Sequence, residues 1–157
     1  MTLAEIRAAI VADFAALAGM ESIHVAGWDG RFSAEDLRSW APRAPAVMVG
    51  VTRVANLKPQ GDHLWGDCAF VAAVIVNDGA GKPRDMRVLE LVGLLIERVE
   101  ATERKPWAGL SEFGDVIEAD KVQASNLASM QLDRKGLTLW AVTWNQRVKV
   151  APVRIFE

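Results

Sequence analysis

The sequence has few of the residues that form covalent or metal cross-links. Of 157 residues, one is cysteine, Cys68, and two are histidines, His24 and His63. A single cysteine excludes an internal disulfide, which favours a reducing compartment. Structural zinc sites usually take four ligands in two short spacings, and the sequence offers no second pair beside His63 and Cys68, even with Asp62 and Asp67 nearby. We therefore predict no metal and no other cofactor, with Cys68 as a small buried residue.

Long apolar runs are also missing. No segment reaches the roughly 18 uninterrupted apolar residues that a membrane span needs. The first residues carry Glu5, Arg7 and Asp13 among the apolar ones, which is not the pattern of a signal peptide. Hydrophobic residues make up 51% of the chain and charged residues 24%, which is typical of a globular protein. We expect one soluble, cytoplasmic domain over residues 1–157 that does not contact a membrane.

Tyrosine is absent and the formal net charge is -2, so the composition does not favour nucleic-acid binding. Arg147, Lys149 and Arg154 near Trp140 and Trp144 form a basic patch with rings, but we expect no direct nucleic-acid recognition. The charge is uneven: from residue 121 onward six basic residues face two acidic ones, a net of +4, which leaves -6 for the rest. Opposite-signed regions suit head-to-tail self-association, and they equally suit mutual neutralisation within one fold.

The strongest secondary-structure signal follows a turn at Asp133–Gly136. After it, residues alternate with a period of two over Leu137–Val150, which predicts a long strand. We interpret its large rings as core, because aromatic residues favour strands and bury much area. One face of this strand consists of Thr138, Trp140, Val142, Trp144, Gln146, Val148 and Val150, and the other of Leu137, Leu139, Ala141, Thr143 and Asn145.

Helical periods occur in three places. Thr2 and Glu5 form a capping box that predicts a helix over residues 1–19, and Ser33 begins a second, short helix that ends near Trp40. A long amphipathic helix is predicted over Asp85–Ala101. Its apolar stripe is Val88, Leu91, Val92, Leu95 and Val99, and its solvent side is Arg87, Glu90, Glu97, Arg98 and Glu100.

Further strands are predicted at Ile23–Ala26, Ala46–Ala55 and Leu64–Val76, and weakly at Val116–Ala124. Leu64–Val76 is apolar on both faces, which indicates a central strand covered on both sides. The intervening Asn56–Asp62 contains proline and glycine and is predicted as a loop, and residues 151–157 as a tail. The order of elements predicts an α+β fold. We expect a largely antiparallel or mixed sheet, packed against the long amphipathic helix and the N-terminal helix.

Glu112, Asp115, Glu118 and Asp120 form an acidic run. Paired carboxylates perform acid–base catalysis only where burial separates their pKa values, and on a surface loop they are solvated charge. We expect no enzyme. A small carboxylate-dependent hydrolase or nuclease is the alternative from a different class, and loss of a metal-dependent activity in Asp115→Ala would favour it.

Five tracts carry a resemblance to a known family. They are A-P-A-V-M-V-G at Ala44–Gly50, V-I-V-N-D at residues 74–78, W-A-G-L at Trp107–Leu110, S-N-L-A-S-M at Ser125–Met130 and L-D-R-K-G-L-T-L-W-A-V-T-W-N-Q at Leu132–Gln146. Together they resemble the tail terminator, or tail-completion, family of Mu-like tailed phages and prophages. The resemblance covers roughly residues 45–146 and is strongest in the last tract.

The resemblance implies an α+β structural subunit that assembles into a hexameric ring. Such a ring caps the tail tube at full length, ends its polymerisation and provides the surface to which the head docks. The implied partners are further copies of the chain, the tail tube protein and the head–tail connector proteins. The implied location is the virion tail, and the host cytoplasm during assembly. The family implies no catalytic residues. Another head–tail joining or minor tail component is the nearest alternative.

A closed ring built from heterologous contacts requires two different, complementary patches on each subunit. Loops on a rigid sheet commonly carry partner contacts, so we expect them at Asn56–Trp65, at Trp107–Asp115 and in the tail from Ala151. An exposed Trp65 or Trp107 would suit an interface anchor, and the alternative is that both rings pack into the core. The candidate interface residues are Lys58, Gln60, Trp65, Trp107, Glu112, Asp115, Arg147, Lys149 and Arg154.

Overall fold

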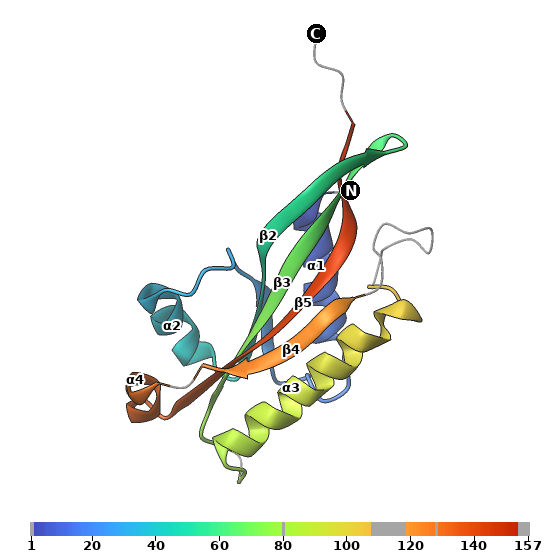
Figure 1. Ribbon diagram of the computed structural model, residues 1–157. Coiled ribbons are helices and arrows are strands. Elements are labelled where there is room, and N and C mark those ends of the chain that lie inside the picture. The colour runs from blue at the N-terminus through green and yellow to red at the C-terminus, as the bar shows by residue number, and fades with distance from the viewer. Residues whose placement is uncertain (1, 80, 108–118, 128, 154–157) are drawn as a thin grey trace.

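A computed structural model describes residues 2–79, 81–107, 119–127 and 129–153 (Figure 1). Its helices are α1 (Leu3–Ala15), α2 (Ala34–Trp40), α3 (Arg84–Glu100) and α4 (Met130–Arg134), with short 3-10 turns at Ala41–Arg43 and Ala101–Glu103. Its strands are β1 (His24–Gly27), β2 (Ala46–Gln60), β3 (His63–Asn77), β4 (Asp120–Asn126) and β5 (Leu137–Pro152).

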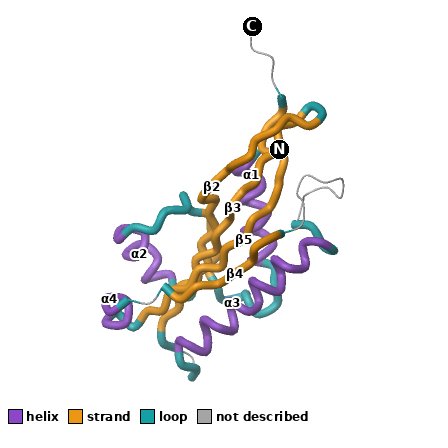
Figure 2. The backbone as a smooth tube through the Cα atoms, in the orientation of Figure 1, coloured by secondary structure: helices purple, strands orange, loops and turns teal. Residues whose placement is uncertain are grey.

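The strands form one mixed sheet in the order β1-β2-β3-β5-β4 (Figure 2). β1 runs parallel to β2, and the other neighbours pair antiparallel. β3 is therefore central, with β2 on one side and the long β5 on the other. The predicted α+β fold, with a largely antiparallel sheet, a long amphipathic helix and an N-terminal helix, is confirmed.

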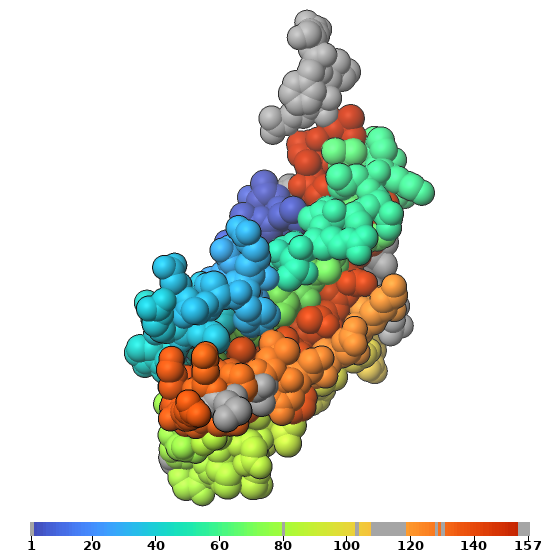
Figure 3. Space-filling model, turned by 60° about the vertical axis from the view of Figure 1, so that its left-hand side comes forward, coloured from blue at the N-terminus to red at the C-terminus, as the bar shows by residue number. Residues whose placement is uncertain are grey.

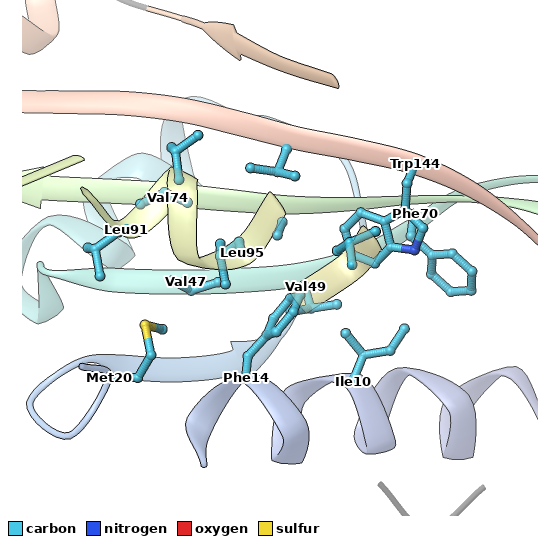
Figure 4. Close-up of a cluster of buried hydrophobic side chains, with 14 of the residues drawn as sticks. Ile10, Phe14, Met20, Val47, Val49, Phe70, Val74, Leu91, Leu95 and Trp144 are labelled. Atoms are coloured by element: carbon cyan, nitrogen blue, oxygen red, sulfur yellow. The ribbon is translucent and has the colours of Figure 1, made fainter. Parts of the chain in front are cut away.

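The helices cover both faces of the sheet. The face against α1 and α3, the α1/α3 face, holds the larger core, in which Phe70 of β3 stacks on Trp144 of β5 at 5.6 Å between ring centroids (Figure 4). The opposite α2/α4 face packs Val71 and Ile75 of β3 against Trp40 and Leu132. Alternate residues of β3 thus enter different cores, as the apolar pattern on both of its faces predicts.

The capping box at the start of α1 is confirmed. The Glu5 backbone N–H donates to Thr2 Oγ1 at 3.2 Å, and the Thr2 N–H donates to Glu5 Oε2 at 2.8 Å. The helix ends at Ala15, earlier than predicted. Its inner side buries Ile6, Ile10 and Phe14 against the sheet, which fixes α1 across β1 and β2.

The predicted loop at Asn56–Asp62 is wrong, because β2 continues to Gln60 and the chain turns only at residues 61 and 62. Two register shifts, at Val51/Arg53 and Ala55/Lys58, accommodate this half of the strand, and Asn56 takes a positive φ of 52°. In the described part of the chain β1 pairs only with the first residues of β2, so Pro59, which pairs with Leu64 of β3, has no strand on its other side, as is usual for a proline within a strand.

Arg98, predicted to lie in solvent, is 5% exposed and forms a buried ion pair with Asp13 of α1. Its Nε and Nη2 donate to the two carboxylate oxygens at 2.6 and 2.7 Å. Nη1 and Nη2 also donate to the carbonyl oxygens of Lys105 and Pro106 at 2.9 and 3.0 Å. The arginine is buried because a bidentate partner and two carbonyls satisfy its donors. The pair ties α1, α3 and the following segment together.

Candidate functional site

Five of the nine predicted interface residues lie together on one end of the sheet. This end, the arm, consists of residues 53–69 of the β2–β3 hairpin and residues 145–152 of β5, and it extends beyond α2, α3 and α4 (Figure 1). The five residues are Lys58, Gln60, Trp65, Arg147 and Lys149. They come together because β5 pairs with β3 along the whole hairpin, from Asn77↔Leu137 to His63↔Pro152.

An ionic network holds the arm in shape. Asp67 of β3 accepts a hydrogen bond from Asn56 Nδ2 at 2.9 Å and another from Arg147 Nη1 at 2.9 Å. Arg147 also donates to the Asn56 carbonyl oxygen at 3.3 Å. The hydrogen bond from Asn56, and then that from Arg147, lower the pKa of Asp67 below its usual value of 3.8. The network connects the bulge of β2 to β5 across β3.

Beside this network, the open face of the arm forms a polar hollow of about 400 Å³. β4 closes one side of it with its first residues, where Lys121 has a positive φ of 53°. Small-molecule pockets are mostly apolar, whereas this hollow combines amide groups with charges of both signs, so it suits a polar protein surface better. Its lining is Arg53, Ala55, Asn56, Asp67, Ala69, Asp120, Lys121, Asn145, Gln146 and Arg147.

Of the two alternatives for Trp65 and Trp107, an exposed anchor or a buried ring, the structure shows burial for both. Trp65 is 8% exposed, and Lys149 Nζ lies 5.6 Å from its ring centroid. Trp107 is 1% exposed, packs edge-on against Phe14, and donates from Nε1 to Gln146 Oε1 at 2.9 Å. Trp65 stabilises the arm, where its ring lies beside the Lys149 ammonium. Trp107 stabilises the junction of the arm with the core, where its indole N–H has an acceptor.

Sequence reasoning missed the exposed Leu57 and the buried Gln146. Leu57 is 55% exposed on the arm. Gln146 is 2% exposed and accepts from two indoles, since Trp144 Nε1 also donates to its Oε1 at 3.0 Å. A polar residue on the apolar side of a strand, between Trp144 and Val148, was the available signal for such a buried acceptor. Nothing in the sequence signalled that Leu57 would project from a strand.

The other predicted site residues lie elsewhere. Glu112, Asp115 and Arg154, and most of the Trp107–Asp115 element, lie outside the described residues. Cys68 is buried in the core, and desolvation raises its pKa to about 11, as expected of a thiol in an apolar site. His63 Nδ1 lies 2.6 Å from Asp62 Oδ1 at the tip of the arm. In the described part of the chain, no three histidine, cysteine or carboxylate side chains gather as metal ligands would.

Comparison with known proteins gives no family assignment: no family model matches the chain, and no significantly similar curated protein was found. Within residues 2–79, 81–107, 119–127 and 129–153, none of the helices is long and apolar enough to cross a membrane.

Proposed function

We propose that the protein is a structural subunit of a phage tail. It assembles into a hexameric ring that caps the tail tube, ends tube polymerisation and provides the head-docking surface. Its partners are other copies of the chain, the tail tube protein and the head–tail connector proteins. It works in the virion tail, after assembly in the host cytoplasm. The phage context rests on the resemblance of residues 45–146 to the tail terminator family, and the ring rests on the shape of the subunit.

One observation carries the ring: the subunit has two unlike ends. Four basic residues of the arm face two acidic ones, Arg53, Lys58, Arg147 and Lys149 against Asp62 and Asp67. The far end, where α3 begins, carries charges of both signs, Asp78 and Asp85 beside Lys82, Arg84 and Arg87, together with the exposed apolar side chains of Met86 and Leu89. Figure 3 shows the arm (green and red) and α3 (yellow-green) at opposite ends of the molecule. Unlike surfaces at opposite ends support heterologous contacts, which close into a ring when the rotation between neighbours allows it.

The first test is the solution mass of the purified protein, measured by light scattering across concentration and salt. A ring of six chains of 17.1 kDa has a mass of about 103 kDa. We expect this mass, or a monomer–hexamer equilibrium that salt shifts toward monomer, because salt screens contacts between charged surfaces. Purified tail tubes, incubated with the protein and imaged by electron microscopy, should carry a cap at one end. A protein that stays monomeric and leaves the tubes uncapped would contradict the proposal.

A further inference from the structure

The polar hollow on the open face of the arm has a small side chain in its floor and charged side chains on its rim. One row of paired residues crosses β2, β3, β5 and β4 in turn: Arg53, Ala69, Asn145 and Asp120. Ala69 in the middle of the row leaves space above the sheet, which hollows the face there. Neighbouring strands lie about 4.8 Å apart, so the hollow spans about 14 Å from β2 to β4.

Two cations on the rim of the hollow are free to bind a carboxylate from another molecule. Arg53 on β2 and Lys121 on β4 both line the hollow and are exposed. In the described part of the chain, neither side chain takes part in an ion pair, whereas Arg147 is bound to Asp67. Both free cations can therefore make charge-assisted hydrogen bonds to a partner.

The hollow also contains hydrogen-bonding groups that suit a peptide. Asn145, half-buried in the row, offers an amide donor and a carbonyl acceptor, and Asp120 offers a carboxylate acceptor. The phosphate backbone of a nucleic acid carries negative charge throughout, so Asp67 and Asp120 would repel it. A peptide carries N–H donors beside its carboxylates. The mixture of groups in the hollow therefore favours a protein segment.

The edges of the arm are poor templates for an added strand. In the described part of the chain, the edge of β2 beyond β1 carries Lys58 and Pro59, and both residue types hinder strand addition. Register shifts also interrupt β2 and β4. A partner segment should therefore meet the arm on its open face instead of extending the sheet.

We propose that the hollow binds an acidic, extended segment of a partner protein, with one carboxylate on Arg53 and another on Lys121. This contact rests on the proposed function, which requires partners besides the other copies of the ring. An extended chain rises about 3.3 Å per residue, so two carboxylates about four residues apart span the hollow. Between them, the backbone of the segment lies over Ala69 and bonds to the Asn145 amide.

Two peptides of the same composition test this spacing. One carries two glutamates four residues apart in a glycine–serine sequence, and the other carries them side by side. Amide NMR titrations at low salt should shift the side-chain amide of Asn145. The spaced peptide should bind at least about twofold more tightly, because only it reaches both cations. Equal binding of the two peptides, or shifts confined to other parts of the molecule, would overturn the proposal.

Removal of the two free cations tests the site itself. Arg53→Gln and Lys121→Gln should each weaken binding of the spaced peptide by about twofold to fivefold, and the double variant by the product of both factors. Asn145→Ala leaves the net charge unchanged and should weaken binding by about twofold or more. Circular dichroism melting checks that each variant folds.

The matched control is Arg38→Gln/Arg43→Gln. It removes the same charge from exposed positions in α2 and in the turn that follows, away from the hollow. Binding of the spaced peptide should change by less than about twofold in this control. Equal losses in the control and in the double variant of the hollow would show attraction by net charge alone and would overturn the site.

Other occupants of the hollow are outcomes of the same experiment. Oligothymidylate that binds more tightly than the spaced peptide, and weakens in the same variants, would assign the hollow to nucleic acid instead. Tighter peptide binding by Glu112→Gln/Asp115→Gln would show that the acidic run of the chain itself competes for the hollow, which would also overturn the proposal. A wild-type protein that remains monomeric and leaves tail tubes uncapped would remove the proposed function itself. A ring that caps tubes but binds neither peptide would remove only this contact.

Discussion

The base and the arm of the sheet consist of the same three strands in different surroundings. In the base, β2, β3 and β5 lie between two layers of helices, and both faces are apolar. In the arm, α2 and α4 no longer cover the sheet, and its open face carries Arg53, Asp67 and Arg147. The base thus holds most of the buried apolar side chains, and the arm presents charged side chains to solvent, where the proposed partner contacts would form. Changes in the two regions should therefore separate stability from assembly.

The largest expected effect comes from breaking the base at its buried ion pair. Asp13→Ala leaves Arg98 buried without its carboxylate, which should lower the free energy of unfolding by about 3–5 kcal/mol. Urea denaturation followed by circular dichroism measures this change. The double variant Asp13→Leu/Arg98→Met removes both charges and should recover most of the loss. A single variant as stable as the wild type would show that the pair does not hold α1 to α3.

A smaller loss is expected at the junction of base and arm. In Gln146→Leu, the indole N–H groups of Trp107 and Trp144 lose their shared acceptor. Each of the two buried donors left unsatisfied costs about 1–3 kcal/mol, and burial of the leucine side chain offsets part of the sum, so we expect a loss of about 2–4 kcal/mol. The near-ultraviolet circular dichroism of the tryptophans should change as well. Gln123→Leu, at an exposed position of β4, is the control. It should change the free energy of unfolding by no more than about 0.5 kcal/mol and leave the near-ultraviolet spectrum unaltered.

The smallest expected effect is a change in the pKa of Asp67 in the arm. The hydrogen bond from Asn56 is the largest single cause of the lowered pKa of Asp67, and Arg147 lowers the same pKa through a hydrogen bond and through its charge. Asn56→Gly, which keeps the positive φ without strain, and Arg147→Ala should each raise that pKa toward 3.8. Carboxyl titration by NMR measures both. Because the folded pKa lies below the unfolded one, the contribution of Asp67 to stability is present above about pH 4 and is lost as pH falls through the folded pKa. A pKa of Asp67 that stays unchanged in both variants would contradict the network.

The sequence predicts the base far better than the arm. The alternation along β3 and β5 gives their faces directly, because a period of two determines which side chains enter which core. Arg98 was misplaced because its partner, Asp13, lies 85 residues away in the chain. For a charged residue at the edge of an apolar stripe, helical periodicity predicts exposure to solvent unless such a partner is known.

The strand structure of the arm was harder to predict, because its sequence contains residues typical of turns. Pro59 and Gly61 are typical of loops, and only the pairing of β3 with both neighbours shows that β2 continues to Gln60. Five candidate residues lie together there because the β2–β3 hairpin carries Lys58, Gln60 and Trp65, and β5, which pairs with β3, adds Arg147 and Lys149. The pairing of β3 with β5 could not be inferred from the hairpin alone. The burial of Trp65 and Trp107 was equally open, since aromatic residues occur both in cores and at interfaces.

The continuous pairing of β3 with β5 has a mechanical consequence. The two strands stay paired from the core to the tip of the arm, with one register shift at Leu64/Trp65. Antiparallel hydrogen bonds lie perpendicular to the strands, so a pull along the arm shears many of them at once instead of opening them one by one. A load applied at the tip of the arm would therefore pass into the folded base, and the arm would behave as a stiff strut.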